Sequence, residues 1–338
     1  MDFNHTEERR MLADSLRRTL ERGADWAALA ELGVLGALFT EDEGGFGGAG
    51  FDIAVVFEEL GRAGCTLPVL EAGLAGGLLA DCGKADLVEQ VIAGDLRVTL
   101  AHGEPGLRYD LGPITTTANG GSVSGRKTVV SAAEDADLLI VSAMADGALA
   151  LFSVDPKGAG VTLHSTPSLD GGTVSELTLD AAPATALGGT QAQLEARIAM
   201  ATLAVCADAI GCMDTARDMT LEYLRTRTQF GVPIGKFQAL QHRMADVAIE
   251  IEMARSAVIN LAGAIGSDVA PRDRQVSAAK NLVGRTALLV AEEAIQMHGG
   301  IAMTEEYALA PISRRLVAVD HRFGDEDWHL ERFIRLSA

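Results

Sequence analysis

A long helical seam with one polar interruption governs which folds this chain can adopt. After the interruption, apolar side chains recur in alternating steps of four and three, which is the spacing of the buried face of a bundle helix. They are Leu240, Met244, Val247, Ile251, Ala254, Val258, Leu261 and Ile265. Another helical segment runs from Gln191 to the interruption and holds no proline before Pro233. Two long helices joined by a short turn predict a four-helix bundle over residues 191–338.

The interruption itself, Arg225–Gln241, carries arginines, glutamines and aromatic side chains where one helix stops and the next starts. Guanidinium groups pair with phosphate oxygens in a fixed fork geometry, so this turn could hold an anionic, planar ligand. An ordinary helix connection with solvated arginines accounts equally well for the same residues. The spacing alone leaves both interpretations open.

The rest of the chain changes its apolar period once. Residues 6–95 show helical spacing, whereas residues 97–187 show short extended runs such as Leu138–Val141. Asn119–Gly121 and Asp170–Gly172 supply hairpin turns between such runs. With no helices between the strands, the pattern predicts an antiparallel β-barrel or sandwich. The expected fold class is α+β, with an N-terminal helical domain (1–96), a middle β domain (97–190) and the C-terminal bundle (191–338).

A glycine-rich run, Gly44–Gly50, invites comparison with a phosphate-binding loop. It lacks the Gly-Lys-Ser/Thr ending of such loops, and no apolar strand leads into it. We therefore interpret it as a close-packed turn that touches a ligand, if at all, through its backbone.

Charge and length restrict the classes of partner. The chain has 338 residues and a formal net charge of -19, which would repel the phosphates of nucleic acid and of anionic membranes. The N-terminal stretch, Met1–Glu8, has no basic region followed by an apolar run, so no secretory signal is expected. Asp, Glu, Arg or Gly breaks the apolar stretches before about 18 residues, the length of a membrane span. We expect a cytoplasmic protein.

Four motifs, in this order, resemble those of the acyl-CoA dehydrogenase family, and the likeness covers nearly the whole chain. They are Glu31–Gly36 with Glu41–Gly48, the loop Glu104-Pro105-Gly106, the turn Arg225–Gln241, and Gln296-Met297-His298-Gly299-Gly300. The third is similar to the family's R-x-x-F-G-x-x-I-x-x-F-Q turn. The fourth is similar to its flavin-contacting Gln and Gly pair.

The resemblance implies FAD as cofactor, in a site shared between subunits. Arg227 would pair with the FAD pyrophosphate, and Gln296, Gly299 and Gly300, from the adjacent subunit, would let the backbone approach the dinucleotide. Ser131 falls where the family often places a hydroxyl on the flavin. The other residues that the resemblance assigns to the cofactor are Gln229, Phe230, Ile234, Phe237 and Gln238, with Gln241 near the same interface. The site therefore requires an oligomer.

The reaction that the resemblance implies is α,β-dehydrogenation of an acyl-CoA thioester to the trans-2-enoyl-CoA. A carboxylate base removes the proton from Cα while a hydride leaves Cβ for the flavin. The implied partners are the acyl-CoA substrate, an electron-transfer flavoprotein, and further subunits in a homotetramer or a heterotetramer with a second acyl-CoA dehydrogenase chain.

The chain departs from the family at the catalytic base. Counting from Arg314-Arg315 places Gly324, and not a glutamate, at the usual base position, and the less common position falls at Ala201-Thr202. Three explanations compete. Asp325, Glu326 or Asp327 could act after a small shift, although such acids commonly form a helix start. Alternatively a partner subunit provides the base, as the resemblance to base-lacking subunits of heteromeric bacterial members implies, or the chain only binds flavin.

A metal site in the C-terminal bundle is the alternative from a different class of protein. A ferritin-like bundle needs Glu-x-x-His pairs on facing helices, but Glu292 and Glu293 are followed by Gln296. The cysteines, Cys65, Cys82, Cys206 and Cys212, lack metal spacing and are expected to be reduced, mostly buried thiols. His242 and His298 fit packing or interface roles better than catalysis. We expect no metal, and a structural helical bundle without flavin remains the other alternative.

Overall fold

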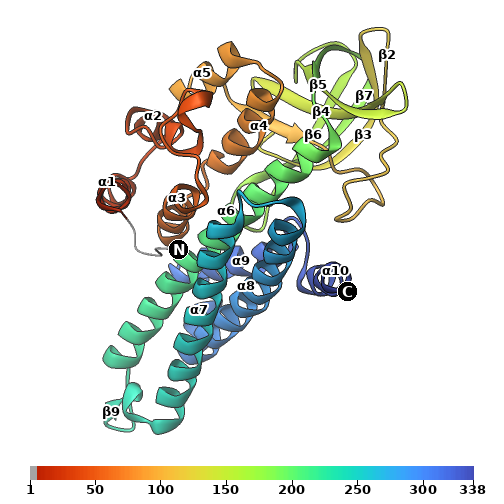
Figure 1. Cartoon of the computed structure of the whole chain (residues 1–338). Coiled ribbons are helices and arrows are strands. Elements are labelled where there is room, and N and C mark those ends of the chain that lie inside the picture. Colours follow the sequence, from red (N-terminus) through yellow and green to blue (C-terminus); the bar gives the residue numbers. More distant parts are fainter. Residues whose placement is uncertain (1–5) are drawn as a thin grey trace. The chain divides into compact units, whose positions relative to one another are not determined.

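The computed structural model describes residues 6–338 (Figure 1). Residues 1–5, part of the stretch in which no secretory signal was seen, lie outside the described residues. The chain forms two compact units, which are described separately. The first contains the chain up to Gly23, Gly50–Cys65 and Thr202–Ala338, and the second contains Ala24–Ala49 and Thr66–Ala201.

The first unit is helical. Its helices are α1 (Glu7–Glu21), α3 (Gly50–Arg62), the later part of α6 (Gln191–Thr226), α7 (Gln238–Ala264), α8 (Val269–His298), α9 (Leu309–His321) and α10 (Glu326–Ser337). In Figure 1, α6 to α9 run side by side, and a small hairpin of β8 (Thr228–Gln229) and β9 (Val232–Pro233) lies at the end where α6 passes into α7. The predicted C-terminal bundle is confirmed.

The apolar seam of α7 behaves as its spacing predicts. Met244, Val247, Ile251, Ala254, Val258 and Leu261 are all buried. From the sequence alone we also interpret Asp268–Arg272 as a loop, and that interpretation is wrong, because α8 begins at Val269 with Asp268 as its N-cap residue. Pro271 misled the prediction, because proline is tolerated in the first helical turn, where its missing N–H has no partner to lose.

Helices α3 and α6 cross with almost no space between their backbones. A Cβ atom on Gly61 would overlap the carbonyl of Asp208, and one on Gly211 would overlap the carbonyl of Glu58. Both positions lie within regular helix, where glycine is unfavourable by about 1 kcal/mol relative to alanine. Glycine is therefore needed at this crossing for close approach.

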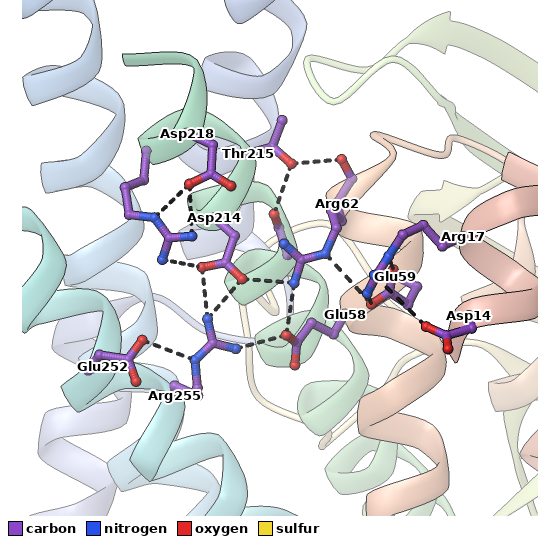
Figure 2. Close-up of polar contacts among 12 residues, drawn as sticks. Asp14, Arg17, Glu58, Glu59, Arg62, Asp214, Thr215, Asp218, Glu252 and Arg255 are labelled. Carbon is purple, nitrogen blue, oxygen red and sulfur yellow. Dashed lines mark hydrogen bonds and ion pairs between the residues drawn. The ribbon is translucent and has the colours of Figure 1, made fainter. Parts of the chain in front are cut away.

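An ionic network ties α1, α3, α6 and α7 together (Figure 2). Its centre is Asp214, whose side chain is only 4% exposed and accepts hydrogen bonds from both Arg62 and Arg255 at 2.8 Å. Glu58 bridges the same two arginines, with Arg255 at 2.8 Å. Buried acids of this kind must be paired, because an isolated buried charge is costly. The network fixes the register of the four helices.

The second unit combines helices with a sheet. The helices are α2 (Trp26–Glu31), α4 (Val69–Asp81), α5 (Ala85–Ala93) and the start of α6, with short 3-10 turns at Gly36–Leu38 and Glu41–Glu43. The strands are β1 (Val98–Ala101), β2 (Thr117–Asn119), β3 (Ser122–Ser131), β4 (Leu138–Ala145), β5 (Ala148–Val154), β6 (Val161–Pro167) and β7 (Thr173–Gly188). Helices precede and follow the strands along the chain, which confirms the α+β class.

The sheet closes on itself. Its order runs β4-β2-β3-β7-β5, and β5 pairs again with β4, while β1 and β6 add to β4 and β7. Inward side chains such as Val123, Leu139, Val141 and Leu177 are fully buried and form its core. Most pairs are antiparallel, as expected, but β1 and β2 pair with β4 in parallel. These two parallel pairs could not be predicted from the strand runs, because strand direction leaves no local pattern.

The glycine run folds as a close-packed turn. The N–H groups of Gly45, Phe46, Gly47 and Gly48 all donate to backbone carbonyls within Gly36–Thr40. A Cβ atom on Gly45 or Gly47 would overlap those carbonyls. Because the N–H groups are used internally, this run cannot cradle a phosphate.

One helix among residues 6–338, α6, is long and apolar enough to cross a membrane by length and composition. Its most apolar window is 78% buried inside the protein, as in the core helix of a bundle. All four cysteines are free thiols, and Cys206 and Cys212 are buried in this helix.

Candidate functional site

The bundle end between α6 and α7 is a hairpin with an exposed tip. Phe230 and Gly231 occupy the two loop positions between β8 and β9, with φ angles of 53° and 82°. Positive φ at both positions is the signature of a type I′ turn, which suits glycine but is unusual for phenylalanine. The turn directs the Phe230 side chain outward, where it is 90% exposed. Its ring forms a T-shaped contact with the Phe237 ring, at a centroid distance of 6.1 Å.

Arg227 stands at the base of this hairpin with its backbone held and its side chain exposed. Its carbonyl accepts from Ile234 N–H at 2.8 Å, and its own N–H donates to the Tyr223 carbonyl at 2.8 Å. Gln241 braces the turn by donating from Nε2 to the Gly235 carbonyl. Within residues 6–338 the guanidinium of Arg227 forms no ion pair. It is therefore available to an anionic ligand.

The end of α8 reaches the same end of the bundle. His298 stacks on Tyr223 with ring centroids 4.5 Å apart and also contacts Tyr307 at 5.3 Å. Nδ1 of His298 lies 2.8 Å from the Ala294 carbonyl and must therefore donate, which fixes the tautomer. Burial lowers the pKa of His298, so the ring is a neutral packing element. The contact therefore joins the end of α6 to the end of α8 within one protomer. That Gln296, Gly299 and Gly300 reach the flavin site of an adjacent subunit stays a prediction.

Gly299 and Gly300 leave that surface open. Gly299 ends α8 with a φ of 70°, a conformation that favours glycine. Both glycines are exposed, and a Cβ atom on either would meet nothing within 4 Å. Gln296 and Gln238 are exposed as well, whereas Ile234 is half-buried. The exposed Gly299 and Gly300 backbone and the exposed side chains of Arg227 and Phe230 thus follow the two helix ends that the Tyr223–His298 contact joins.

Ser131 belongs to the second unit, at the end of β3. It is half-buried, and its carbonyl accepts from the Thr99 hydroxyl at 2.7 Å. The strand is distorted beside it: the register shifts between Lys127 and Val130, and Val129 has a φ of 54° while 75% exposed. A β-branched residue in that region is strained, and such strain gathers at binding sites. The approach of Ser131 to a flavin stays a prediction.

A buried ion pair supports the neighbouring loop. Lys127, fully buried, donates to Glu104 at 2.8 Å and to the Ser142 hydroxyl at 3.1 Å. Glu104 also accepts from the backbone and hydroxyls of Thr115 and Thr116. Burial alone would raise the pKa of Glu104, but Lys127 and these donors hold it well below its usual range. The loop that begins with Glu104 is thereby fixed to the inside of the barrel.

Glu104 belongs to one of the sequence motifs, but its partner, Lys127, was not predicted. The available signal was that Val123, Gly125 and Lys127 lie two residues apart in β3, which places Lys127 on the inner face with Val123. A lysine in a barrel core needs a carboxylate partner. His102 completes the cluster: its Nδ1 lies 2.8 Å from the Ser142 hydroxyl, to which Lys127 already donates. Burial together with the charge of Lys127 lowers the pKa of His102 to about 4.

The acids near Gly324 serve the start of α10. Asp325 is its N-cap residue, buried, and accepts from Trp328 N–H at 2.9 Å. Glu326 and Asp327 form the first turn, where acids favour the helix dipole. At the other position, Ala201 and Thr202 are buried and bring no carboxylate. The three acids that follow Gly324 therefore serve as the N-cap residue and the first turn of α10.

Comparisons with known proteins agree over both ends of the chain. Residues 6–94 match the acyl-CoA dehydrogenase N-terminal domain, and residues 188–335 match the acyl-CoA dehydrogenase C-terminal domain. Acyl-CoA dehydrogenase FadE28 of Mycobacterium tuberculosis is 30% identical over 324 residues, which cover 91% of each chain.

Solved structures give the same result at the level of the fold. A chain of the ChsE4-ChsE5 complex from Mycobacterium tuberculosis superposes with a TM-score of 0.90 at 26% identity, over 99% of this chain and 98% of that one. A variant of the Tcur3481-Tcur3483 steroid ACAD superposes with a TM-score of 0.88 at 29% identity, over 98% of each chain. Each of these structures carries two protein names, ChsE4 with ChsE5 and Tcur3481 with Tcur3483.

Proposed function

This chain belongs to the acyl-CoA dehydrogenase family, and from that premise we propose that it is a subunit of an FAD-dependent enzyme that dehydrogenates an acyl-CoA to the trans-2-enoyl-CoA. More narrowly, we propose that it completes the flavin site while a different subunit supplies the catalytic base. One observation carries the narrower proposal: Asp325, beside the Gly324 that the sequence count places at the base position, is the N-cap residue of α10.

The proposed flavin contacts lie on the exposed bundle end. When bound, FAD accepts the hydride that leaves Cβ of the acyl group. Arg227 would bind its pyrophosphate with a bidentate, charge-assisted contact. Gly299 and Gly300 would let the backbone approach the dinucleotide, and Phe230, with Gln229, would line the adenosine half. The hydroxyl of Ser131, in the β domain, would donate a hydrogen bond to the flavin.

The proposed partner is a second, base-carrying acyl-CoA dehydrogenase chain in a heterotetramer. The two-name composition of the ChsE4-ChsE5 and Tcur3481-Tcur3483 structures supports this assignment. Phe230 and Met303 are 90% and 74% exposed, and burial of such apolar side chains against a partner would support assembly. An electron-transfer flavoprotein would reoxidise the flavin, and the acidic chain would work in the cytoplasm.

The first experiment is purification of the native complex from its own cell, with its mass and subunit identities measured. A flavin absorbance spectrum and two different acyl-CoA dehydrogenase chains are expected. A homotetramer that turns over acyl-CoA by itself would remove the narrower proposal. A colourless protein that takes up no FAD, alone or with any co-purified chain, would remove the flavin assignment altogether.

Substitutions separate cofactor binding from base supply. In the complex, Glu326→Gln and Asp327→Asn should leave the rate of acyl-CoA dehydrogenation within about twofold, because the base lies elsewhere. Arg227→Ala should lower flavin content with the subunits still assembled. Loss of turnover by several orders of magnitude in Glu326→Gln, with flavin content intact, would assign the base to this chain.

A further inference from the structure

Gly324, the residue that the sequence count places at the base position, is closely surrounded by other side chains of the protein. Gly324 is buried with a φ of 120°, a conformation that side chains rarely adopt. A Cβ atom there would lie 2.5 Å from Nε2 of His329 and 2.8 Å from the Trp328 ring. A longer side chain at Gly324 would therefore be directed against the first turn of α10. His329 and Trp328 occupy the space beside Gly324, so no cavity is left there for a glutamate side chain.

A buried lysine holds this loop from the opposite side. Lys280, on α8, is fully buried, and its Nζ donates to the Gly324 carbonyl at 2.6 Å and to the Asp320 carbonyl at 2.9 Å. Burial lowers the pKa of Lys280. Both contacts are to backbone, so Lys280 binds the loop whatever side chains the loop carries. A lysine at a core position is rarely retained without such a partner.

Neighbouring positions on the same face of α8 act on the same loop. Asn281 donates from Nδ2 to the Glu326 carbonyl at 2.9 Å. Gly284, one turn further, has no Cβ, and that absence makes room for the Asp320 carboxylate, which accepts from Glu326 N–H at 3.0 Å. Since residues three and four apart share a helix face, these contacts form one polar stripe along α8.

Helix α10 closes the loop from its other end. His329 is 1% exposed and donates from Nε2 to the Phe323 carbonyl at 3.0 Å. Burial, together with the charge of Lys280, lowers the pKa of His329 to about 3, so the ring stays neutral. Both the Phe323 and the Gly324 carbonyls are thus satisfied by buried donors from two different helices.

We propose that Arg322–Asp325 is a closed base position, locked by Lys280 as the positioning residue, and that no carboxylate of this chain can enter the reaction from it. A shift that brought Asp325 or Glu326 forward would have to break the contacts of Lys280, Asn281 and His329 together. This inference rests on the proposed function, and it adds that a simple substitution at Gly324 cannot convert this loop into a base-carrying one.

Hydrogen exchange tests the lock without reference to activity. In the purified protein, Lys280→Met should speed amide exchange in the segment 320–329 by roughly ten- to a hundredfold, because two buried hydrogen bonds to the loop are lost. Exchange in the buried part of α6 should stay unchanged. Lys157→Met, which removes an exposed lysine in the β5–β6 turn, is the matched control and should change neither segment.

A conservative replacement distinguishes positioning from general packing. Lys280→Arg keeps a cation with several donors and should restore most of the protection that Lys280→Met loses. If segment 320–329 exchanges equally fast in the unaltered protein and in Lys280→Met, or if the arginine behaves as the methionine does, Lys280 does not lock the loop.

A substitution that introduces a glutamate at Gly324 is the second test of the closed base position. Gly324→Glu, in the chain reconstituted with FAD and without a partner, should show no acyl-CoA dehydrogenation above the unaltered chain, and it should lower the melting temperature. Turnover that appears with Gly324→Glu and vanishes with Gly324→Gln would overturn the closed position. Failure to bind FAD both alone and with a co-purified partner chain would count against the proposed function, whereas the exchange experiment would still decide on the lock.

Discussion

The Tyr223 ring lies on the His298 ring with centroids 4.5 Å apart, and this one contact joins two motifs separated by about seventy residues. Tyr223 precedes Arg227 by one helical turn, and His298 precedes Gly299 directly. A free guanidinium and a bare backbone are thereby presented from one surface. Any ligand that uses both must approach from outside the protomer, since both are exposed.

Replacement of Arg227 by alanine should weaken FAD binding. Loss of a charge-assisted contact to a phosphate is worth about 1.5–3 kcal/mol, which corresponds to roughly a ten- to 150-fold rise in Kd. Quenching of flavin fluorescence in the assembled complex measures this change. Arg225→Ala, an exposed arginine in the last turn of α6, is the control. Equal Kd values for the two variants would contradict the role of Arg227.

Lys127→Met should destabilise the second unit strongly. It leaves the Glu104 carboxylate buried without its cation, which costs about 3–5 kcal/mol in comparable pairs. Denaturant unfolding monitors the change in free energy. Arg126→Ala, one residue away on the same strand, removes an exposed pair in which both side chains are 62% exposed, and should cost under about 1 kcal/mol. Similar losses for both variants would argue against a buried pair.

Stability should rise with pH between about 4 and 6.5. His102 has a pKa of about 4 in the fold and an ordinary value of 6.5, so in this window the unfolded chain binds the extra proton. By linkage, the group removes about 1.4 kcal/mol per pH unit as the pH falls, until its folded pKa is reached. The slope of unfolding free energy against pH near 5.5 should report about one proton fewer in His102→Gln. A slope identical to that of the unaltered protein would be inconsistent with a neutral, buried His102.

The helix crossing should be intolerant of a single methyl group. Gly61→Ala places a Cβ atom on the Asp208 carbonyl and must push α3 away from α6, at a cost of about 1–3 kcal/mol or more. Gly266→Ala meets nothing within 4 Å and needs no unusual φ, so it should be neutral or slightly stabilising. Thermal unfolding of the two variants should differ in sign. Tolerance of Gly61→Ala would mean that the helices are not in contact there.

The elements that could be predicted are those with a local period. The α7 seam and the strand at Leu138–Val141 were readable because burial of one face repeats every 3.6 or 2 residues. Asn119–Gly121 was readable as a hairpin, because positive φ at Gly120 and Gly121 selects glycine. These signals need no knowledge of the tertiary structure.

What escaped prediction depends on contacts between distant segments. The parallel pairing of β1 with β4 and the partner of Glu104, 23 residues away, leave no local pattern. Lys280 looked like an ordinary polar position of a helix, and only the path of the 320–326 loop reveals its purpose. The assignment of Gly324 to the base position, by counting from Arg314-Arg315, stays a prediction, and the packing around Gly324 could not be inferred from the sequence.

Phe230 has a practical consequence for handling the protein. A phenyl ring that is 90% exposed at a hairpin tip keeps its apolar surface in water, and burying such a ring is worth about 1.5–3 kcal/mol. A preparation of this chain without its assembly partners should therefore self-associate as its concentration rises. Sedimentation velocity over a dilution series should show this association, and Phe230→Ser should shift it to higher concentration.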